Sequence, residues 1–323
     1  MLEPKDWPAM VLPMPSQWHV SGYSRAGEAT GFYVKQMRWF LDAGVPTSQI
    51  KPDIVFISHS HTDHSMMLPL LVDRRKPLRV YAPAEAVPFL AGYVAGMNKL
   101  NQQSDDYEDR SAGYTYIPVT TGQTVQIDNK FWAHVIDCEH PVTSVGYCFF
   151  EKRKRLKDEF KGKSGRELGQ LRKDGVELNE EAELPYMAFL GDTTGKVLVD
   201  HGKLLSTYPV VFIECTFFQP DHKDAAAGSQ HLHWSDLRPF ALEHRDTTFI
   251  LIHFSKRYSD DEIHAFFDNE RASQRELEAA EDAAASATGG CPKRRPAFDN
   301  VVVWLAGLGQ HTAESARAGP IGE

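Results

Sequence analysis

Residues 58–64 read S-H-S-H-T-D-H and follow directly on a short apolar run at 53–58 that is predicted to be a buried strand. Residues two apart in an extended loop point the same way, so His59 and His61 can bind one metal ion. A helix after the loop would turn Asp63 and His64 toward a second ion. Zinc prefers imidazole and carboxylate ligands. The stretch therefore predicts a two-metal site at the end of a strand.

Further candidate ligands lie beyond this stretch, each at the end of a short apolar run. They are His140, Asp192 within Gly-Asp-Thr, and His253. Any one of them alone would fit a buried polar side chain with an ordinary hydrogen-bond partner. Their recurrence at predicted strand ends favours a shared role as ligands of the same metal pair.

The composition is that of a globular protein. The 323 residues are 42% hydrophobic and carry a formal net charge of −9, which disfavours nucleic acid as a partner of the whole surface. No apolar run reaches the length of a membrane span, and the first residues lack the apolar core of a signal peptide. The four cysteines are too sparse for a disulfide framework. We therefore expect a cytoplasmic protein with reduced thiols and no membrane contact.

Strand-like and helix-like segments alternate along the chain. Further strands are predicted at 114–118, 124–127, 131–137, 144–150, 187–190, 210–213, 249–252 and 301–305, and helices at 66–73, 85–98, 235–244 and 260–285. We expect a single domain over 1–323 with a charged inserted arm at about 152–183 and a flexible linker at about 283–296. Residues 151–173 hold ten Lys and Arg against four Asp and Glu, so a nucleic-acid surface could be confined to this segment.

Several motifs together resemble one family. The H-x-H-x-D-H stretch, H-P-V-T-S-V-G-Y at 140–147, E-C-T-F at 214–217 and H-F-S-K-R-Y at 253–258 are similar to the metallo-β-lactamase superfamily. Within it the chain most resembles the ribonuclease Z branch, which processes the 3′ end of tRNA. The resemblance covers about residues 20 to 305. It implies a four-layer αβ/βα sandwich, in which helices flank two mixed sheets.

The resemblance also implies roles for individual residues. One zinc ion would be bound by His59, His61 and His140, the other by Asp63, His64 and His253, with Asp192 bridging both. Mn²⁺ or Fe²⁺ would fit the same ligands. Asp63, Glu214 and His231 are expected to be catalytic, with Glu214 orienting His231 as the acid. His233, Lys256 and Arg257 are expected to contact substrate.

Two departures from the family pattern leave the substrate open. Ribonuclease Z usually has H-S-T where this chain has H-L-H at 231–233, so either His231 or His233 could be the acid. The family's Gly-Asp-Thr is usually followed by Arg-Pro, whereas Thr194 and Gly195 follow here. The predicted arm also lacks the family's Gly-Pro-rich tip.

The leading hypothesis is a two-metal phosphodiesterase or endoribonuclease, in which a metal-bound hydroxide attacks phosphorus. Its partner would be RNA, such as precursor tRNA. The alternative is a hydrolase of small molecules, such as a cyclic phosphodiester, a lactone or a thioester, on the same site. A binding protein with a relic metal site is the third hypothesis. The resemblance suggests a homodimer.

Overall fold

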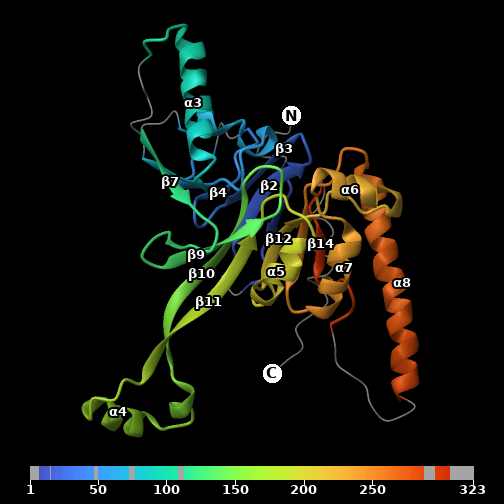
Figure 1. Ribbon diagram of the computed structural model, residues 1–323. Coiled ribbons are helices and arrows are strands. Elements are labelled where there is room, and N and C mark those ends of the chain that lie inside the picture. Colours follow the sequence, from blue (N-terminus) through green and yellow to red (C-terminus); the bar gives the residue numbers. More distant parts are fainter. Residues whose placement is uncertain are drawn as a thin grey trace.

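The computed structural model describes residues 7–14, 16–46, 50–72, 77–107, 113–286 and 295–305, and it contains two β-sheets (Figure 1). Within these residues each sheet has seven strands. The first sheet runs in chain order through β1 (Ala9–Val11), β2 (His19–Arg25), β3 (Ala29–Val34), β4 (Trp39–Leu41), β5 (Ile54–Phe56), β6 (Leu78–Pro83) and β7 (Tyr114–Val119). The second contains β8 (Thr124–Gln126), β9 (Phe131–Cys138), β10 (Ser144–Leu156), β11 (Asn179–Phe189), β12 (Val210–Glu214), β13 (Thr248–Ile252) and β14 (Val301–Val303).

Both sheets are mixed. Strands β1 to β4 pair antiparallel, whereas β4 to β7 pair parallel. In the second sheet β8 to β11 are antiparallel and β11 to β14 are parallel. The carboxyl ends of parallel strands meet at one edge of a sheet, so the loops after β5, β12 and β13 can approach one another. His59 and His61 lie in the loop after β5, and His253, Lys256 and Arg257 lie in the loop after β13.

Side-chain alternation along the buried strands places the core in three layers. In β5, Ile54 and Phe56 join the cluster between the sheets, whereas Val55 packs outward. In β12, Phe212 faces inward and Val211 outward. Strand side chains point to opposite faces with a period of two, so each sheet has an apolar surface on both sides. The second surface has to be covered by helices.

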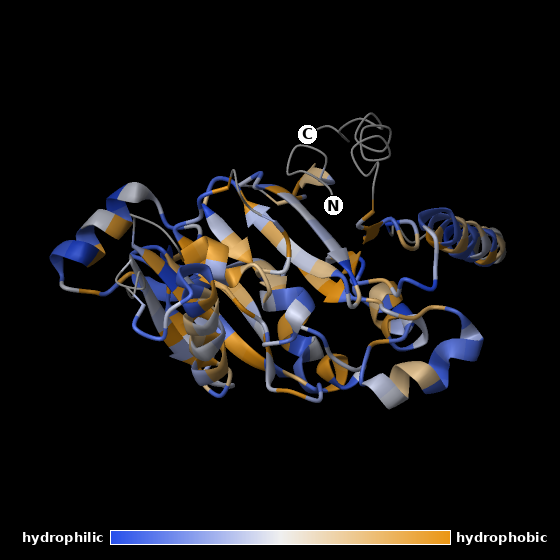
Figure 2. Cartoon of the chain, turned by 90° about the horizontal axis from the view of Figure 1, so that it is seen from above, coloured by the Kyte–Doolittle hydropathy of each residue, from blue (hydrophilic) through white to orange (hydrophobic). Residues whose placement is uncertain are grey.

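Helices cover both outer faces. The first sheet is covered by α1 (Thr62–Ser65), α2 (Leu68–Val72) and α3 (Val87–Gln102), and the second by α5 (Lys196–Leu205), α6 (Lys223–Ser229), α7 (Trp234–Glu243) and α8 (Asp260–Ser286). In Figure 2 the hydrophobic colour concentrates on the strands in the middle, and the peripheral helices carry most of the hydrophilic colour. The predicted four-layer sandwich is thereby confirmed.

A long hairpin leaves the second sheet where the inserted arm was predicted. Strands β10 and β11 continue past the sheet and carry α4 (Gly165–Lys173) at their far end, after the short 3₁₀ helix Asp158–Phe160 (Figure 1). The sequence prediction ended the first of these strands at residue 150 because the charged run that follows reads as solvated loop. That charged run is instead paired with an acidic run in β11, opposite Glu180, Glu181 and Glu183.

Other short elements escaped the sequence prediction, namely β1 to β4, β6, α5 and α6. Strand β2, for example, reads H-V-S-G-Y-S-R, which has no continuous apolar run. The linker predicted at 283–296 lies largely outside the described residues. No helix in the described part of the chain is both long and apolar enough to cross a membrane.

Candidate metal centre

The histidine-rich loop changes from extended to helical backbone in its middle. His61 has extended dihedral angles (φ −57°, ψ 148°) and immediately precedes α1, which begins at Thr62. The Ser65 hydroxyl donates to the carbonyl oxygens of Ser60 and His61, which holds the turn in place. His59 and His61 therefore lie on the extended part, and Asp63 and His64 lie on the helix.

The first group of potential ligands gathers side chains from three loops. His59, His61, His140 and Asp192 each place one ligand atom within 4.8 Å of the others. His61 Nδ1 lies 3.1 Å from His140 Nε2, and His59 Nε2 lies 3.7 Å from Asp192 Oδ2. The structure thus brings together the residues predicted to bind the first ion.

The second group consists of Asp63, His64 and His253. His64 Nε2 lies 3.2 Å from His253 Nε2, and Asp63 Oδ2 lies 3.3 Å from His253 Nε2. Asp192 Oδ2 is 3.4 Å from both His64 Nε2 and His253 Nε2. Asp192 therefore lies between the two groups, where the family resemblance places a bridging ligand.

The donor set fits divalent cations. His59 Nε2 is buried, and it has no hydrogen-bond partner among the described residues. Burial, reinforced by His64, holds the pKa of the His59 ring well below its usual value, so the ring keeps a free lone pair. Burial opposes ionisation of Asp192, but His253 and His64 outweigh it and hold its pKa well below the usual range. A buried carboxylate beside several imidazole nitrogens is a suitable site for a cation.

Asp42 supports this centre from behind, and the sequence prediction gave it no role. Its carboxylate accepts hydrogen bonds from the Ser58 backbone N–H at 2.7 Å, the Ser58 hydroxyl at 2.9 Å and His64 Nδ1 at 2.7 Å. The bond engages Nδ1 of His64 and leaves its Nε2 facing the cluster, 3.4 Å from Asp192 Oδ2. Gly44 allows the backbone to pack closely here, because a Cβ at this position would lie 1.7 Å from the Asp63 carbonyl oxygen. In the sequence the only local sign is the Leu-Asp-Ala-Gly run at 41–44, which does not show the burial of Asp42 or its distant partners.

His253 is held by a second set of partners. Its backbone has φ +62°, which is uncommon for a residue other than glycine, and its N–H donates to Ser24 Oγ at 3.0 Å. Its ring Nδ1 lies 3.1 Å from Thr216 Oγ1, and Thr216 in turn donates to Glu214. Unusual backbone angles of this kind gather at functional sites because the surroundings hold them.

Glu214 and His231 form an ion pair at the rim of the cluster. His231 Nδ1 lies 2.9 Å from Glu214 Oε1 and 4.0 Å from Asp192 Oδ2. Burial lowers the pKa of His231, but the Glu214 carboxylate outweighs this and raises it to about 9. The ring is therefore protonated near neutral pH, and 16% of the side chain is exposed. It has the state and access that a proton donor needs.

His233 occupies a different position. It precedes α7, where its Nδ1 accepts from the Ser235 backbone N–H at 3.1 Å, and its Nε2 lies 2.9 Å from the Gln219 carbonyl oxygen. Both ring nitrogens are therefore engaged away from the cluster, and the side chain is buried. Of the two candidate acids, the structure brings only His231 to the cluster.

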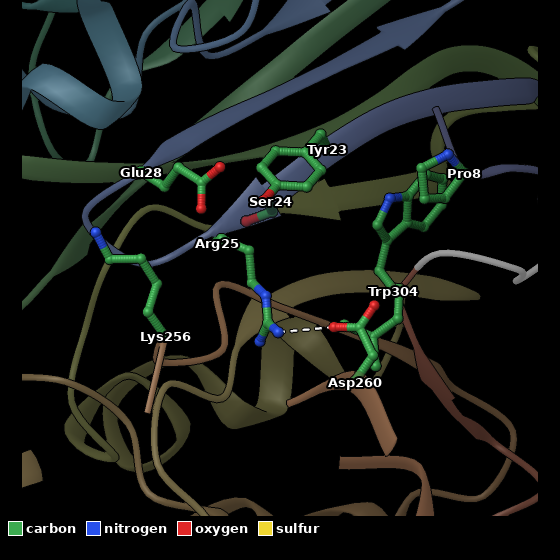
Figure 3. Close-up of a pocket in the computed structure, with 9 residues that line it drawn as sticks. Pro8, Tyr23, Ser24, Arg25, Glu28, Lys256, Asp260 and Trp304 are labelled. Atoms are coloured by element: carbon green, nitrogen blue, oxygen red, sulfur yellow. Dashed lines mark hydrogen bonds and ion pairs between the residues drawn. The ribbon is translucent and has the colours of Figure 1, made fainter. Parts of the chain in front are cut away.

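Lys256 and Arg257 lie beyond His253 on the surface. Lys256 lines a hollow of about 400 Å³ next to the turn between β2 and β3, where its Nζ donates to the Gly27 carbonyl at 3.2 Å. Figure 3 shows Arg25 paired with Asp260 in this hollow, and Lys256 and Glu28 at its other end. Positive and negative groups balance there. Arg257 lies over the Phe217 ring, 5.8 Å from its centre.

Comparison with known proteins identifies the family. The sequence profile of the metallo-β-lactamase superfamily matches residues 45–153. A chloroplastic tRNase Z of Arabidopsis thaliana is 28% identical over 255 residues, which is 76% of this chain and 69% of that protein. A ribonuclease Z of Methanococcus maripaludis is 30% identical over 244 residues, 68% of this chain and 74% of that protein. The chain belongs to the ribonuclease Z family.

The solved structure of the short form of human tRNase Z has the same fold as this chain. The TM-score is 0.50 with 19% identity, over 74% of this chain and 93% of that structure. The predicted family and the prediction of a metal-dependent hydrolase are thereby confirmed. The roles of individual residues and the identity of the metal stay predictions.

Proposed function

We propose that the chain is an endoribonuclease that uses two divalent cations to cleave a phosphodiester bond in RNA. The His231–Glu214 pair beside Asp192 carries this proposal. Cleavage of an RNA phosphodiester bond releases a ribose alkoxide, which is a poor leaving group and needs a proton. Hydrolysis of a thioester releases a good leaving group and needs no such donor. A dedicated, carboxylate-held histidine therefore favours the phosphodiester.

The two ligand groups described above would hold the cations, and imidazole with carboxylate favours zinc among them. When bound, the pair would lower the pKa of a water molecule and neutralise negative charge on the phosphoryl oxygens. Asp63 is kept in position for this role by the Gly27 backbone N–H, which donates to its Oδ2 at 2.7 Å.

The protein's own contribution is the control of one proton. Glu214 accepts from His231 Nδ1, from the Thr193 backbone N–H at 2.7 Å and from the Leu232 backbone N–H at 3.1 Å. These bonds fix the carboxylate, and the carboxylate fixes the ring. With Nδ1 engaged, the proton that His231 donates leaves from Nε2 toward the departing ribose oxygen.

Precursor tRNA is the proposed RNA, because the relatives are named as tRNase Z and ribonuclease Z.

We also propose that the chain forms one domain with the hairpin as an insertion. The apolar cluster shared by both sheets supports this. A cytoplasmic location is supported by three buried free cysteines, Cys138, Cys148 and Cys215. A homodimer stays a prediction of the family resemblance, to be tested by sedimentation.

The test uses two substrates side by side, a precursor tRNA with a 3′ trailer and bis-p-nitrophenyl phosphate. We expect the purified, metal-loaded protein to cleave the tRNA at the 3′ end of its body. Asp192→Ala should abolish cleavage of both substrates, because this carboxylate touches both ligand groups. Hydrolysis of the small diester without any cleavage of RNA would contradict RNA as the substrate, but it would still support the proposed metal centre.

One observation favours a small-molecule substrate instead. Thr194 Oγ1 donates to Glu139 Oε2 at 2.6 Å, which places a carboxylate beside His140. A negative group at this rim repels a polyanion more than it repels a compact diester or ester. Glu139→Gln distinguishes the two, because it should raise kcat/KM for RNA and leave the small diester unchanged.

A further inference from the structure

A second hollow, of about 300 Å³, lies on the outer side of the histidine-rich loop. Ser60 and Thr62, which flank His61 in the chain, are among the residues that line it. Phe89 and Tyr93 of α3 line it as well, together with Met66. The volume is at the lower end of the range for sites that bind small organic groups. The hollow therefore shares a loop with the metal centre without containing any of its ligands.

The aromatic rings of Phe89 and Tyr93 are both exposed, and Tyr93 is also held by a hydrogen bond. Phe89 is 75% exposed, and Tyr93 is 39% exposed although both are large rings. They are four residues apart on one helix, so they share a face. The Tyr93 hydroxyl donates to the Met66 carbonyl oxygen at 2.8 Å, which anchors the helix to the end of α1. Two aromatic rings, one of them anchored, are thus presented to solvent beside the loop of the metal centre.

We infer that this hollow is a stacking site for one unpaired nucleobase next to the scissile phosphate. This inference rests on the proposed endoribonuclease function. Every base has a π-face, so exposed aromatic rings bind bases whatever the sequence. The hydroxyls of Ser60 and Thr62 supply polar contacts within the same hollow. The loop that lines this hollow also carries His59, His61 and Asp63 of the metal centre. A base bound here would therefore belong to a nucleotide close to the reacting phosphate.

The test measures coupling between the ring and the base. Wild-type protein, Phe89→Ala and Phe89→Trp are assayed on intact precursor tRNA and on matched RNAs with one abasic nucleotide on either side of the cleavage site. We expect wild-type kcat/KM to fall about 5- to 150-fold at one abasic position, the factor that corresponds to stacking one base. Phe89→Ala should lose a similar factor on intact RNA and nothing further at that position. Phe89→Trp should behave like wild type.

Leu100→Ala is the matched control, because Leu100 is 67% exposed on the same helix and does not line the hollow. Bis-p-nitrophenyl phosphate reports the metal centre and should be hydrolysed equally by all variants. If wild type cleaves every RNA alike, or if the losses from Phe89→Ala and the abasic site multiply, the stacking site is excluded and the endoribonuclease function stands. A change in sedimentation with Phe89→Ala and no base dependence would assign the ring to a second copy and overturn the inference. Failure of wild type on intact RNA would overturn both.

Discussion

The metal centre and the β10–β11 hairpin both consist of charged and polar residues, but they are built in opposite ways. In the centre, His59, His64, Asp192 and Glu214 are at most 3% exposed, and their partners come from distant parts of the chain. In the hairpin, charged side chains face partners on the neighbouring strand and remain in water. Buried groups need fixed partners because an unpaired one is costly, whereas exposed groups are solvated in any case.

The two regions should therefore respond differently to substitution. Changes in the centre should affect catalysis or metal binding strongly, even where the new residue is similar in size. Changes in the hairpin should affect only the substrate that reaches it. The predictions that follow test this contrast, first in the centre and then in the hairpin.

Among variants that keep all the predicted metal ligands, the largest effect is expected from His231→Ala, which removes the proposed proton donor. The kcat for RNA should fall by about 10²- to 10⁴-fold, the usual contribution of a general acid. Hydrolysis of bis-p-nitrophenyl phosphate should fall much less, because p-nitrophenolate leaves without a proton. His233→Ala serves as the control and should leave both rates nearly unchanged. Equal losses on the two substrates would count against an acid role for His231.

Asp42→Asn tests the support behind the centre. The amide cannot accept the hydrogen bond from His64 Nδ1 as a carboxylate does, so the ring is no longer held as a ligand. Metal affinity or activity should fall by about 10- to 100-fold, measured by titration against a chelator. Asp53→Asn is the matched control, since Asp53 pairs with Arg38 on the surface. A normal affinity in Asp42→Asn would show that His64 does not depend on this bond.

Shortening the hairpin should affect RNA alone. Residues 157–178 would be replaced by an Asn-Gly turn, which suits the facing pair Leu156 and Asn179. We expect KM for RNA to rise only on the order of three- to ten-fold at low salt, because the removed residues hold six Lys and Arg against five Asp and Glu and so carry little net positive charge. Hydrolysis of bis-p-nitrophenyl phosphate should not change. Loss of the small-substrate activity would mean that the hairpin supports the centre directly.

The smallest effect is expected from Arg155→Ala. Arg155 pairs with Glu180 at 2.7 Å, but their side chains are 56% and 38% exposed. An exposed ion pair contributes about 0–1 kcal/mol to the free energy of unfolding. Urea denaturation should therefore show a change within this range. A larger loss would place the hairpin among the parts of the molecule that hold the fold together.

The contrast also explains what the sequence could predict. The clustering of the predicted ligands could be anticipated because they lie in one local motif and at the ends of apolar strands. Their supports were not, because each is defined by a distant partner. Ser58 and Asp42 are 16 positions apart, Thr216 and His253 are 37 apart, and Ser24 and His253 are 229 apart. Nothing local distinguishes such a serine or threonine from an ordinary one.

The hairpin illustrates the reverse problem. The local excess of Lys and Arg in residues 151–173 predicted a basic surface. Pairing brings Glu180, Glu181 and Glu183 opposite that run, so the basic strand is largely balanced by its neighbour. A charge count along the chain cannot show this, because Arg155 and Glu180 are 25 positions apart. Only the register of the two strands decides it.

The predicted metal ligands come from both sheets, and this has a consequence for the order of events during biosynthesis. His64 follows β5 in the first sheet and His253 follows β13 in the second, 189 positions later. A nascent chain that has not yet emerged past β13 lacks part of the second ligand group, even when its first sheet is complete. With the predicted ligand set, tight metal binding would occur only after the two sheets have docked. Once bound, the ions would link the two sheets and oppose their separation.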